Sequence, residues 1–308
     1  MHKILFLRKF KKISGGQIKV RDYFEHCLQH PALEPYVYFT PDSCHARSHL
    51  WREVSAERIV RELALETYDA LFIAGKDWEL LPASVRGVKI INLVQHVKHA
   101  DARDDRFAFL SRPAHRLCVS AEVLEAITPH MNGPAHVIPN GVSLEMFAPG
   151  AEKARNSILI WARKNPALGQ RLHETLLDRG LGSSLLVDYL PRADFAAALR
   201  ATDIFVALTN PSEGFYLPGL EGMASGCAVV CADAIGNRSF CLHGQTCLMP
   251  QWGDYDEHLA MIERLLREKD LKEKIRRAGQ AQAQTFSLQN ERARFYQFLD
   301  EHIFVKER

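Results

Sequence analysis

Two glutamates, Glu213 and Glu221, stand eight positions apart on either side of a proline that can begin a helix. The apolar run at residues 203–209 has the β-branched and aromatic character of a buried parallel strand, so the turn after it lies at a strand's carboxyl end. Ligands of open α/β sheets bind at that edge. Pro218 suits a first helical position and Gly226 the position just past a helix end, which predicts a helix of about two turns between them.

Such a turn can bind an anion that carries sugar hydroxyls. The amides before Pro218 would lack helical acceptors, and a helix N-terminus favours an anion such as a diphosphate. Glu213, in the loop, could reach a sugar or its developing positive charge, while Glu221, one turn into the helix, could accept two hydrogen bonds from ribose hydroxyls. The alternative is that both carboxylates only complement the helix dipole, which is worth about 0.3–1 kcal/mol.

Two hexapeptides carry a resemblance to a known family. Residues 213–218 read Glu-Gly-Phe-Tyr-Leu-Pro and residues 221–226 read Glu-Gly-Met-Ala-Ser-Gly, followed by an apolar run that ends near Asp233 and Gly236. This pattern resembles the signature of the retaining glycosyltransferases of family 4, which is Glu-Gly-Phe-Gly-Leu-Pro, then Glu-Ala-Met-Ala-Ser-Gly. The likeness continues at Ser14-Gly15-Gly16, at residues 138–142 with Phe147, and at residues 243–248.

The resemblance implies an α/β fold of the GT-B type, with two Rossmann-like doubly wound parallel-sheet domains that face each other across a cleft. It implies an acceptor-side domain at residues 1–148, a donor-side domain at residues 149–289, and a C-terminal helix at residues 290–308 that crosses back to the first domain. The length of 308 residues suits two domains, and 47% hydrophobic with 25% charged residues is ordinary for globular cores.

An alternation of strands and helices along the chain predicts parallel sheets with helices on both faces. Strands are expected at residues 3–7, 36–39, 70–73, 89–94, 116–119, 135–138, 157–161, 184–188, 204–208, 228–232 and 246–249. Helices are expected at residues 170–179, 193–200, 254–269, 271–284 and 290–303. In the last of these, Phe295, Phe298, Leu299 and Ile303 recur at helical spacing and are expected to be packing groups.

The first domain supplies three candidate residues by resemblance. Gly15 and Gly16 follow the first strand, and their lack of a Cβ would permit close approach of a donor phosphate or sugar. His96 ends another strand, where an imidazole can donate a hydrogen bond to a sugar hydroxyl or a phosphate. The alternative for His96 is a surface residue or a satisfied core residue.

The second domain supplies the other candidates. Arg163 and Lys164 follow its first strand, where cations can neutralise a departing diphosphate, and they join Glu213 and His96 as expected catalytic residues. The family has Gly-Arg and a later Lys-Gly, so Lys164 takes the second role only if the loop is rearranged; an exposed basic pair is the alternative. The donor-binding residues expected on this side are Gly214, Phe215, Tyr216, Leu217 and Glu221.

One of these positions departs from the family pattern. Tyr216 stands where the family commonly has glycine, and its ring is expected beside the diphosphate turn, where it would narrow the sugar or acceptor pocket.

No metal and no resident cofactor are expected. The chain has no Asp-x-Asp motif with apolar flanks, and Asp101, Asp104 and Asp105 stand in a charged stretch typical of a solvated loop. Phosphate charge would then be handled by Arg, Lys and helix amides without Mg²⁺ or Mn²⁺. The cysteines give no disulfide framework, and those at positions 227, 231, 241 and 247 lack the close paired spacing of a zinc site.

The activity implied by the resemblance is transfer of a hexose-like sugar, with retained anomeric configuration, from a UDP- or GDP-linked donor. The acceptor would be a hydroxyl of a glycan, a lipid-linked or a small molecule, in polysaccharide or glycoconjugate biosynthesis. Two alternatives stay open. One is another GT-B chemistry, such as nucleotide-sugar epimerisation or phosphorolysis, and the other is an inactive scaffold subunit of a glycan-assembly complex.

Charge and hydropathy bear on partners and location. A net charge of +2 and the lack of a recognised motif argue against a nucleic-acid binder. The N-terminal apolar run is too short for a signal peptide, and no run of about 18 apolar residues occurs, so a cytoplasmic protein is expected. A basic cluster of Lys11, Lys12, Lys19 and Arg21 could meet a lipid-linked diphosphate or anionic lipid at the inner face of the cell membrane, or could be solvated surface.

Overall fold

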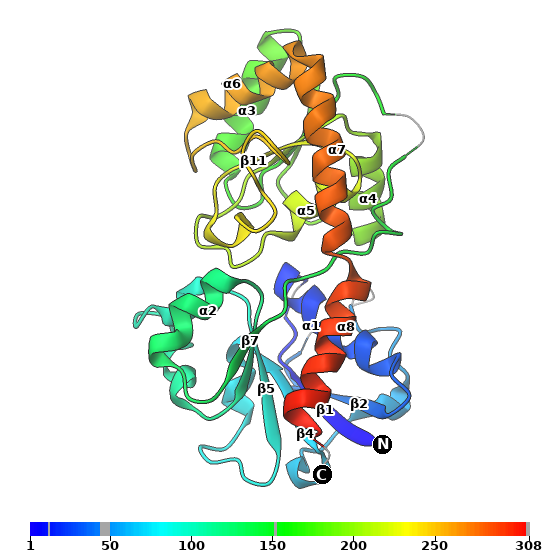
Figure 1. Cartoon of the computed structure of the whole chain (residues 1–308), viewed down its shortest axis with the longest axis vertical. Helices are drawn as coiled ribbons and strands as arrows, with labels where there is room; N and C mark the ends of the chain where they lie inside the picture. Colours follow the sequence, from blue (N-terminus) through cyan, green and yellow to red (C-terminus); the bar gives the residue numbers. More distant parts are fainter. Residues whose placement is uncertain (12, 44–49, 151–152, 306–308) are drawn as a thin grey trace. The chain divides into compact units, whose positions relative to one another are not determined.

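The computed structural model describes residues 1–11, 13–43, 50–150 and 153–305. They divide into two compact units (Figure 1). Unit 1 comprises Met1–Pro139 with Glu291–Arg308, and unit 2 comprises Asn140–Asn290. Both are built on parallel sheets flanked by helices, as the alternating sequence pattern predicts.

Unit 1 contains a seven-stranded parallel sheet in the order β3-β2-β1-β4-β5-β6-β7. Its strands are β1 His2–Arg8, β2 Leu33–Phe39, β3 Ile59–Val60, β4 Ala70–Ala74, β5 Lys89–Val94, β6 His115–Cys118 and β7 Ala135–Val137. Strand β4 and the Ile4–Leu7 part of β1 are wholly apolar and buried, because helices and loops cover both faces of such a sheet. The six expected strands are confirmed; β3 was missed because two residues show no periodicity.

Three α-helices belong to this sheet or pack on it: α1 Gly15–Leu28, α2 Ala121–Ile127 and α8 Leu288–Phe298. Ser14 caps α1, since its side chain accepts a hydrogen bond from the Gln17 amide. Short 3-10 turns fill most of the remaining connections, and a π-turn at Leu299–Ile303 follows α8. The expected helix at residues 290–303 therefore begins two residues earlier and changes its winding after Phe298.

Helix α8 packs beside α1 (Figure 1, red and blue) through aromatic side chains. The ring of Phe295 lies 4.8 Å from that of Tyr23 and 6.2 Å from that of Phe72 on β4. Phe295, Phe298, Leu299 and Ile303 are all buried, which confirms the packing role expected from their spacing.

A buried ionic cluster joins the same two helices. Lys19 Nζ on α1 lies 2.6 Å from Glu291 Oε2 on α8 and 2.8 Å from Asp22 Oδ2. The other oxygen of Glu291 lies 2.9 Å from His26 Nε2. Burial alone would lower the pKa of Lys19, but the charges of Asp22 and Glu291 outweigh it and raise that pKa above its usual value.

This cluster corrects an expectation about the surface. Lys19 is fully buried, and Arg21 is mostly covered, with its guanidinium near Phe24 and Trp51. Lys11 is ion-paired with Asp42 at 2.6 Å, and Lys12 lies outside the described residues. Lys19 and Arg21 therefore do not contribute to the exposed basic surface that suggested contact with anionic lipid. Across the described residues, no helix is both long enough and apolar enough to span a membrane.

Unit 2 contains a four-stranded parallel sheet in the order β11-β10-β8-β9. Its strands are β8 Ile158–Trp161, β9 Ser183–Leu186, β10 Ile204–Ala207 and β11 Ala228–Cys231. Its helices are α3 Pro166–Asp178, α4 Arg192–Ala201, α5 Leu217–Ala224, α6 Tyr255–Arg267 and α7 Lys269–Thr285. An apolar core lies between these layers, and α7 runs along α5 (Figure 1).

The prediction of a strand at residues 246–249 is wrong in its extent. The segment forms two isolated bridges, Leu248 with Val230 and Cys247 with His243. The reason is Thr246, whose hydroxyl donates to the Phe240 carbonyl at 2.6 Å and accepts from the Leu242 amide at 2.8 Å. These bonds hold the chain before Leu248 in a tight turn instead of an extended ladder.

We predict that Glu291→Gln lowers the free energy of unfolding by about 3–5 kcal/mol, because it leaves the buried charge of Lys19 without its fully buried anionic partner. Urea titration followed by circular dichroism measures the change. The matched control is Glu301→Gln, on the solvent side of the π-turn, with an expected change within about 0.5 kcal/mol. Equal, small effects of the two substitutions would contradict a stabilising role for the cluster.

Candidate functional site

The carboxyl edge of the unit 2 sheet brings together two residues that the sequence places 49 positions apart. β8 and β10 are adjacent parallel strands, so the loops that follow them leave from the same edge. Lys164 follows β8 and Glu213 follows β10, and Lys164 Nζ lies 2.6 Å from Glu213 Oε1. The lysine is half exposed and the glutamate largely covered, so this ion pair stands at the mouth of the loop cluster.

The start of α5 is open to an anion. Tyr216 is its N-cap but forms no side-chain cap, and Pro218 has no amide hydrogen. The amide of Tyr216 donates to Asn237 Oδ1 at 3.0 Å. The amides of Gly214, Phe215 and Leu217 have no acceptor in the part of the chain that the structure describes. Three donors thus remain at the positive end of the helix dipole.

Glu221 lies inside α5 with its side chain 1% exposed. Arg192, the first residue of α4, places Nη1 2.5 Å from Glu221 Oε1. Sequence reasoning missed Arg192. A signal existed, because a cation at the first position of a helix opposes the helix dipole and calls for an anionic partner nearby.

Arg163 lies on aromatic rings at the end of β8. Its guanidinium carbon is 5.7 Å from the Trp161 ring and 5.5 Å from the Tyr189 ring. Burial raises the pKa of Tyr189, and the positive charges of Arg192 and Arg163 oppose that rise, which locates both guanidinium groups near the same ring. No carboxylate among the described residues pairs with Arg163, whose charge therefore stays available at this edge.

The ring of Tyr216 does not project into the turn. It is buried, and its hydroxyl donates to the Leu208 carbonyl at 3.0 Å. Burial raises the pKa of this phenol well above its usual value. The expectation that the ring narrows a pocket at the turn is thus wrong, because a carbonyl at the end of β10 draws the hydroxyl inward. Phe215 is buried too, against Phe240 and Phe286, so its contribution would come from its backbone.

The loop that contains Gly236 holds the turn at residues 213–217, called the acidic turn below, in place. The amide of Gly236 donates to the Glu213 carbonyl at 2.9 Å, and a Cβ on Gly236 would lie 1.9 Å from the Gly214 carbonyl oxygen. On the helix, a Cβ on Gly222 would lie 2.5 Å from the Phe205 ring. That ring explains why the chain has glycine where the family signature has alanine.

In unit 1, Gly15 and Gly16 begin α1, and His96 follows β5 at the same carboxyl edge of the sheet. The first two amides of a helix have no intrahelical acceptor, so these glycines present donors there. The space beside Gly16 is not open, because Gln95 fills it and donates to the Gly16 carbonyl at 3.3 Å. Nδ1 of His96 accepts from the Lys98 amide at 3.2 Å, which fixes the ring.

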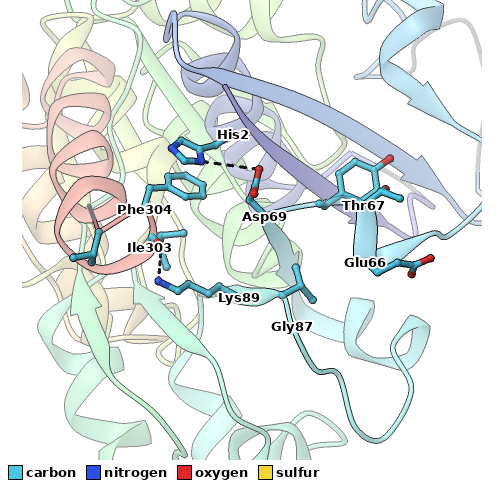
Figure 2. Close-up of a pocket in the computed structure, with 11 residues that line it drawn as sticks. His2, Glu66, Thr67, Asp69, Gly87, Lys89, Ile303 and Phe304 are labelled. Carbon is cyan, nitrogen blue, oxygen red and sulfur yellow. Dashed lines mark hydrogen bonds and ion pairs between the residues drawn. The ribbon is translucent and has the colours of Figure 1, made fainter. Parts of the chain in front are cut away.

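An open hollow of about 780 Å³ lies elsewhere in unit 1 (Figure 2). Figure 2 shows His2 stacked on Phe304 and Lys89 reaching the Ile303 carbonyl, at 2.5 Å. His2 begins β1 and Lys89 begins β5, so the hollow lies at the amino edge of the sheet. It is therefore distinct from the edge that carries the candidate residues.

Within residues 1–11, 13–43, 50–150 and 153–305, no set of three or more His, Cys, Asp or Glu side chains is arranged to hold a metal ion.

Comparisons with known proteins agree with this geometry. Residues 142–268 match the family model of glycosyl transferases group 1, a stretch that contains the whole acidic turn, Arg163 and Arg192. A search of curated proteins by sequence finds no match.

Solved structures match along nearly the whole chain. A sucrose-phosphate synthase from Thermosynechococcus elongatus matches with a TM-score of 0.73 at 14% identity, over 97% of this chain and 98% of that one. HepE from Anabaena, in complex with UDP-glucose, matches with a TM-score of 0.75 at 16% identity, over 97% and 99%. A glycosyltransferase from Rickettsia africae ESF-5 matches with a TM-score of 0.70 at 13% identity, over 99% of each chain. The chain has the GT-B fold.

We predict that Gly236→Ala lowers the free energy of unfolding by about 3 kcal/mol, because the new Cβ displaces the backbone that carries Glu213. Gly182→Ala is the matched control, since nothing lies within 4 Å of its added Cβ, and it should leave stability unchanged or slightly raised. Urea denaturation of both variants makes the comparison. Equal stabilities would show that the two loops are not locked together.

Proposed function

We propose that this protein is a retaining glycosyltransferase that moves a sugar from a UDP- or GDP-linked donor to an acceptor hydroxyl. The observation that carries the proposal is the turn from β10 into α5. There, three amides that have no acceptor among the described residues lie between Glu213 and Glu221, and each of these carboxylates is ion-paired with a cation. The match of residues 142–268 to the group 1 family supports it. So does the shared fold of HepE, whose solved complexes contain UDP-glucose and UDP.

In this proposal the nucleotide lies along the carboxyl edge of the unit 2 sheet. Glu221 accepts hydrogen bonds from ribose hydroxyls, and the diphosphate sits on the amides of Gly214, Phe215 and Leu217. Arg163, which pairs with no carboxylate among the described residues, stabilises the diphosphate as the sugar bond breaks. Lys164 exchanges its contact with Glu213 for a phosphate oxygen when the donor binds.

The chemical step is electrostatic in character. As the glycosidic bond to the diphosphate breaks, positive charge develops on the sugar, and Glu213 lies where it can stabilise that charge. The acceptor hydroxyl attacks the face that the diphosphate leaves, its oxygen forms the new bond, and its proton goes to a phosphate oxygen. Proton NMR of the product distinguishes this retained anomeric configuration from an inverted one.

Unit 1 contributes the remaining proposed contacts. The first amides of α1, at Gly15 and Gly16, and the ring of His96 serve the donor phosphate and sugar, and the acceptor is held by this unit. The phosphate charge is met by guanidinium, ammonium and amide groups, so we propose a reaction that needs no metal and proceeds in EDTA.

We expect Glu221→Ala to weaken binding of the preferred nucleoside diphosphate by about 1.5–3 kcal/mol, the worth of a charged hydrogen bond. Calorimetric titration with UDP and GDP measures it. Glu263→Ala removes an ion-paired glutamate from α6 and is the control, with no expected change. Unchanged affinity in Glu221→Ala contradicts the ribose assignment, and no binding of any nucleotide to the unaltered protein favours the scaffold alternative.

Arg163→Ala should lower kcat by about 10²–10³-fold, because it removes a preorganised positive charge from the leaving group. The rate of nucleoside diphosphate release from the donor sugar reports it. Arg179→Ala, at the end of α3, removes an arginine whose ion pair within the described residues is with Glu263, and it serves as control. A near-normal kcat in Arg163→Ala would remove this residue from the mechanism.

A further inference from the structure

We propose that Arg192 is a positioning residue that holds Glu221 for the ribose and thereby sets the protein's preference for ribonucleotides over 2′-deoxyribonucleotides. The proposal rests on the proposed function, since it deepens the account of the same nucleotide site. Its basis is the contact of 2.5 Å between Arg192 Nη1 and Glu221 Oε1, which joins the start of α4 to the interior of α5.

The position of Arg192 is costly unless it has a partner. It is the first residue of α4, where the helix dipole disfavours a positive charge, and no side chain in the described ranges caps that helix. Its guanidinium carbon lies 4.8 Å from the ring of Phe147, which is fully buried. Phe147 thus gives the stem and guanidinium a fixed surface, and Glu221 offsets the charge.

Glu221 depends on the arginine in turn. A carboxylate that is almost wholly covered is expensive to leave without a cation or donor. Oε1 accepts from Arg192, whereas Oε2 has no donor among the described residues. The arginine therefore fixes the plane of the carboxylate and leaves one oxygen to accept hydrogen bonds from ribose hydroxyls.

The surroundings place this pair at the same edge as the other candidate residues. Arg192 follows β9 through the loop that carries Tyr189, and Tyr189 contacts Arg163 after β8. The loops after β8, β9 and β10 thus meet around one phenol ring and one carboxylate. We therefore assign Arg192 and Glu221 to the nucleoside half of the site, because Lys164 and Glu213 lie where the phosphate and sugar would bind.

The experiment compares the affinity of the preferred nucleoside diphosphate, UDP or GDP, with that of its 2′-deoxy counterpart by calorimetry. Unaltered protein should prefer the ribonucleotide by about tenfold, the worth of one good hydrogen bond. Arg192→Ala should reduce that preference to less than about threefold by weakening the ribonucleotide more than the deoxyribonucleotide. Arg192→Lys should restore part of it, and adding Glu221→Ala to Arg192→Ala should change it no further.

The control is Arg200→Ala at the other end of α4, where the guanidinium donates to the Met146 carbonyl; it should keep the full preference. An equal loss of affinity for the ribonucleotide and the deoxyribonucleotide in Arg192→Ala overturns the proposal, because it indicates that Arg192 contacts the base or the diphosphate directly. If Arg192→Ala lowers the melting temperature but keeps the preference for the ribonucleotide, the proposal is overturned too. No binding of any nucleoside diphosphate to unaltered protein overturns the proposed function itself, whereas a preference that needs Glu221 but survives Arg192→Ala overturns only the positioning role.

Discussion

The negative charges of Glu213, in the turn after β10, and of Glu221, within α5, are the constraint that organises unit 2. Glu213 and Glu221 lie in covered positions, and each is held by a cation from another loop, Lys164 after β8 and Arg192 after β9. Only a sheet with parallel neighbours brings these loops to one edge. Between the two carboxylates, the amides of Gly214, Phe215 and Leu217 have no acceptor in the described parts of the chain, so the arrangement that neutralises the protein's own charges also leaves donors for an anion.

Unit 1 meets a related constraint in its interior. Lys19 is buried one turn below Gly15 and Gly16, and Glu291 from α8 balances its charge. The start of α1 is therefore fixed by a residue far along the chain, and removing either partner leaves a buried charge only partly balanced. The aromatic contact between Phe295 and Tyr23 adds apolar packing to the same helix pair.

Much of this architecture can be predicted from local sequence. The strands at β1, β8 and β10 stand out as short apolar runs, and Pro218 with Gly226 delimits α5 to within a residue. Arg192 could not be paired with Glu221 from sequence, because 29 residues and a strand separate them. Likewise, the sequence predicts that the ring of Tyr216 lies in the turn. In the folded unit the Leu208 carbonyl is within reach of its hydroxyl, which explains why the ring points inward. Lys19 reads as surface charge because its partner Glu291 is distant in sequence.

The central claim is that the turn between β10 and α5 binds a nucleoside diphosphate. A crystal structure of the protein with UDP or GDP, grown in EDTA, tests it most directly. We expect the diphosphate on the amides of Gly214, Phe215 and Leu217 and the ribose hydroxyls on Glu221. A nucleotide bound elsewhere, or one whose ribose faces away from Glu221, would contradict the account.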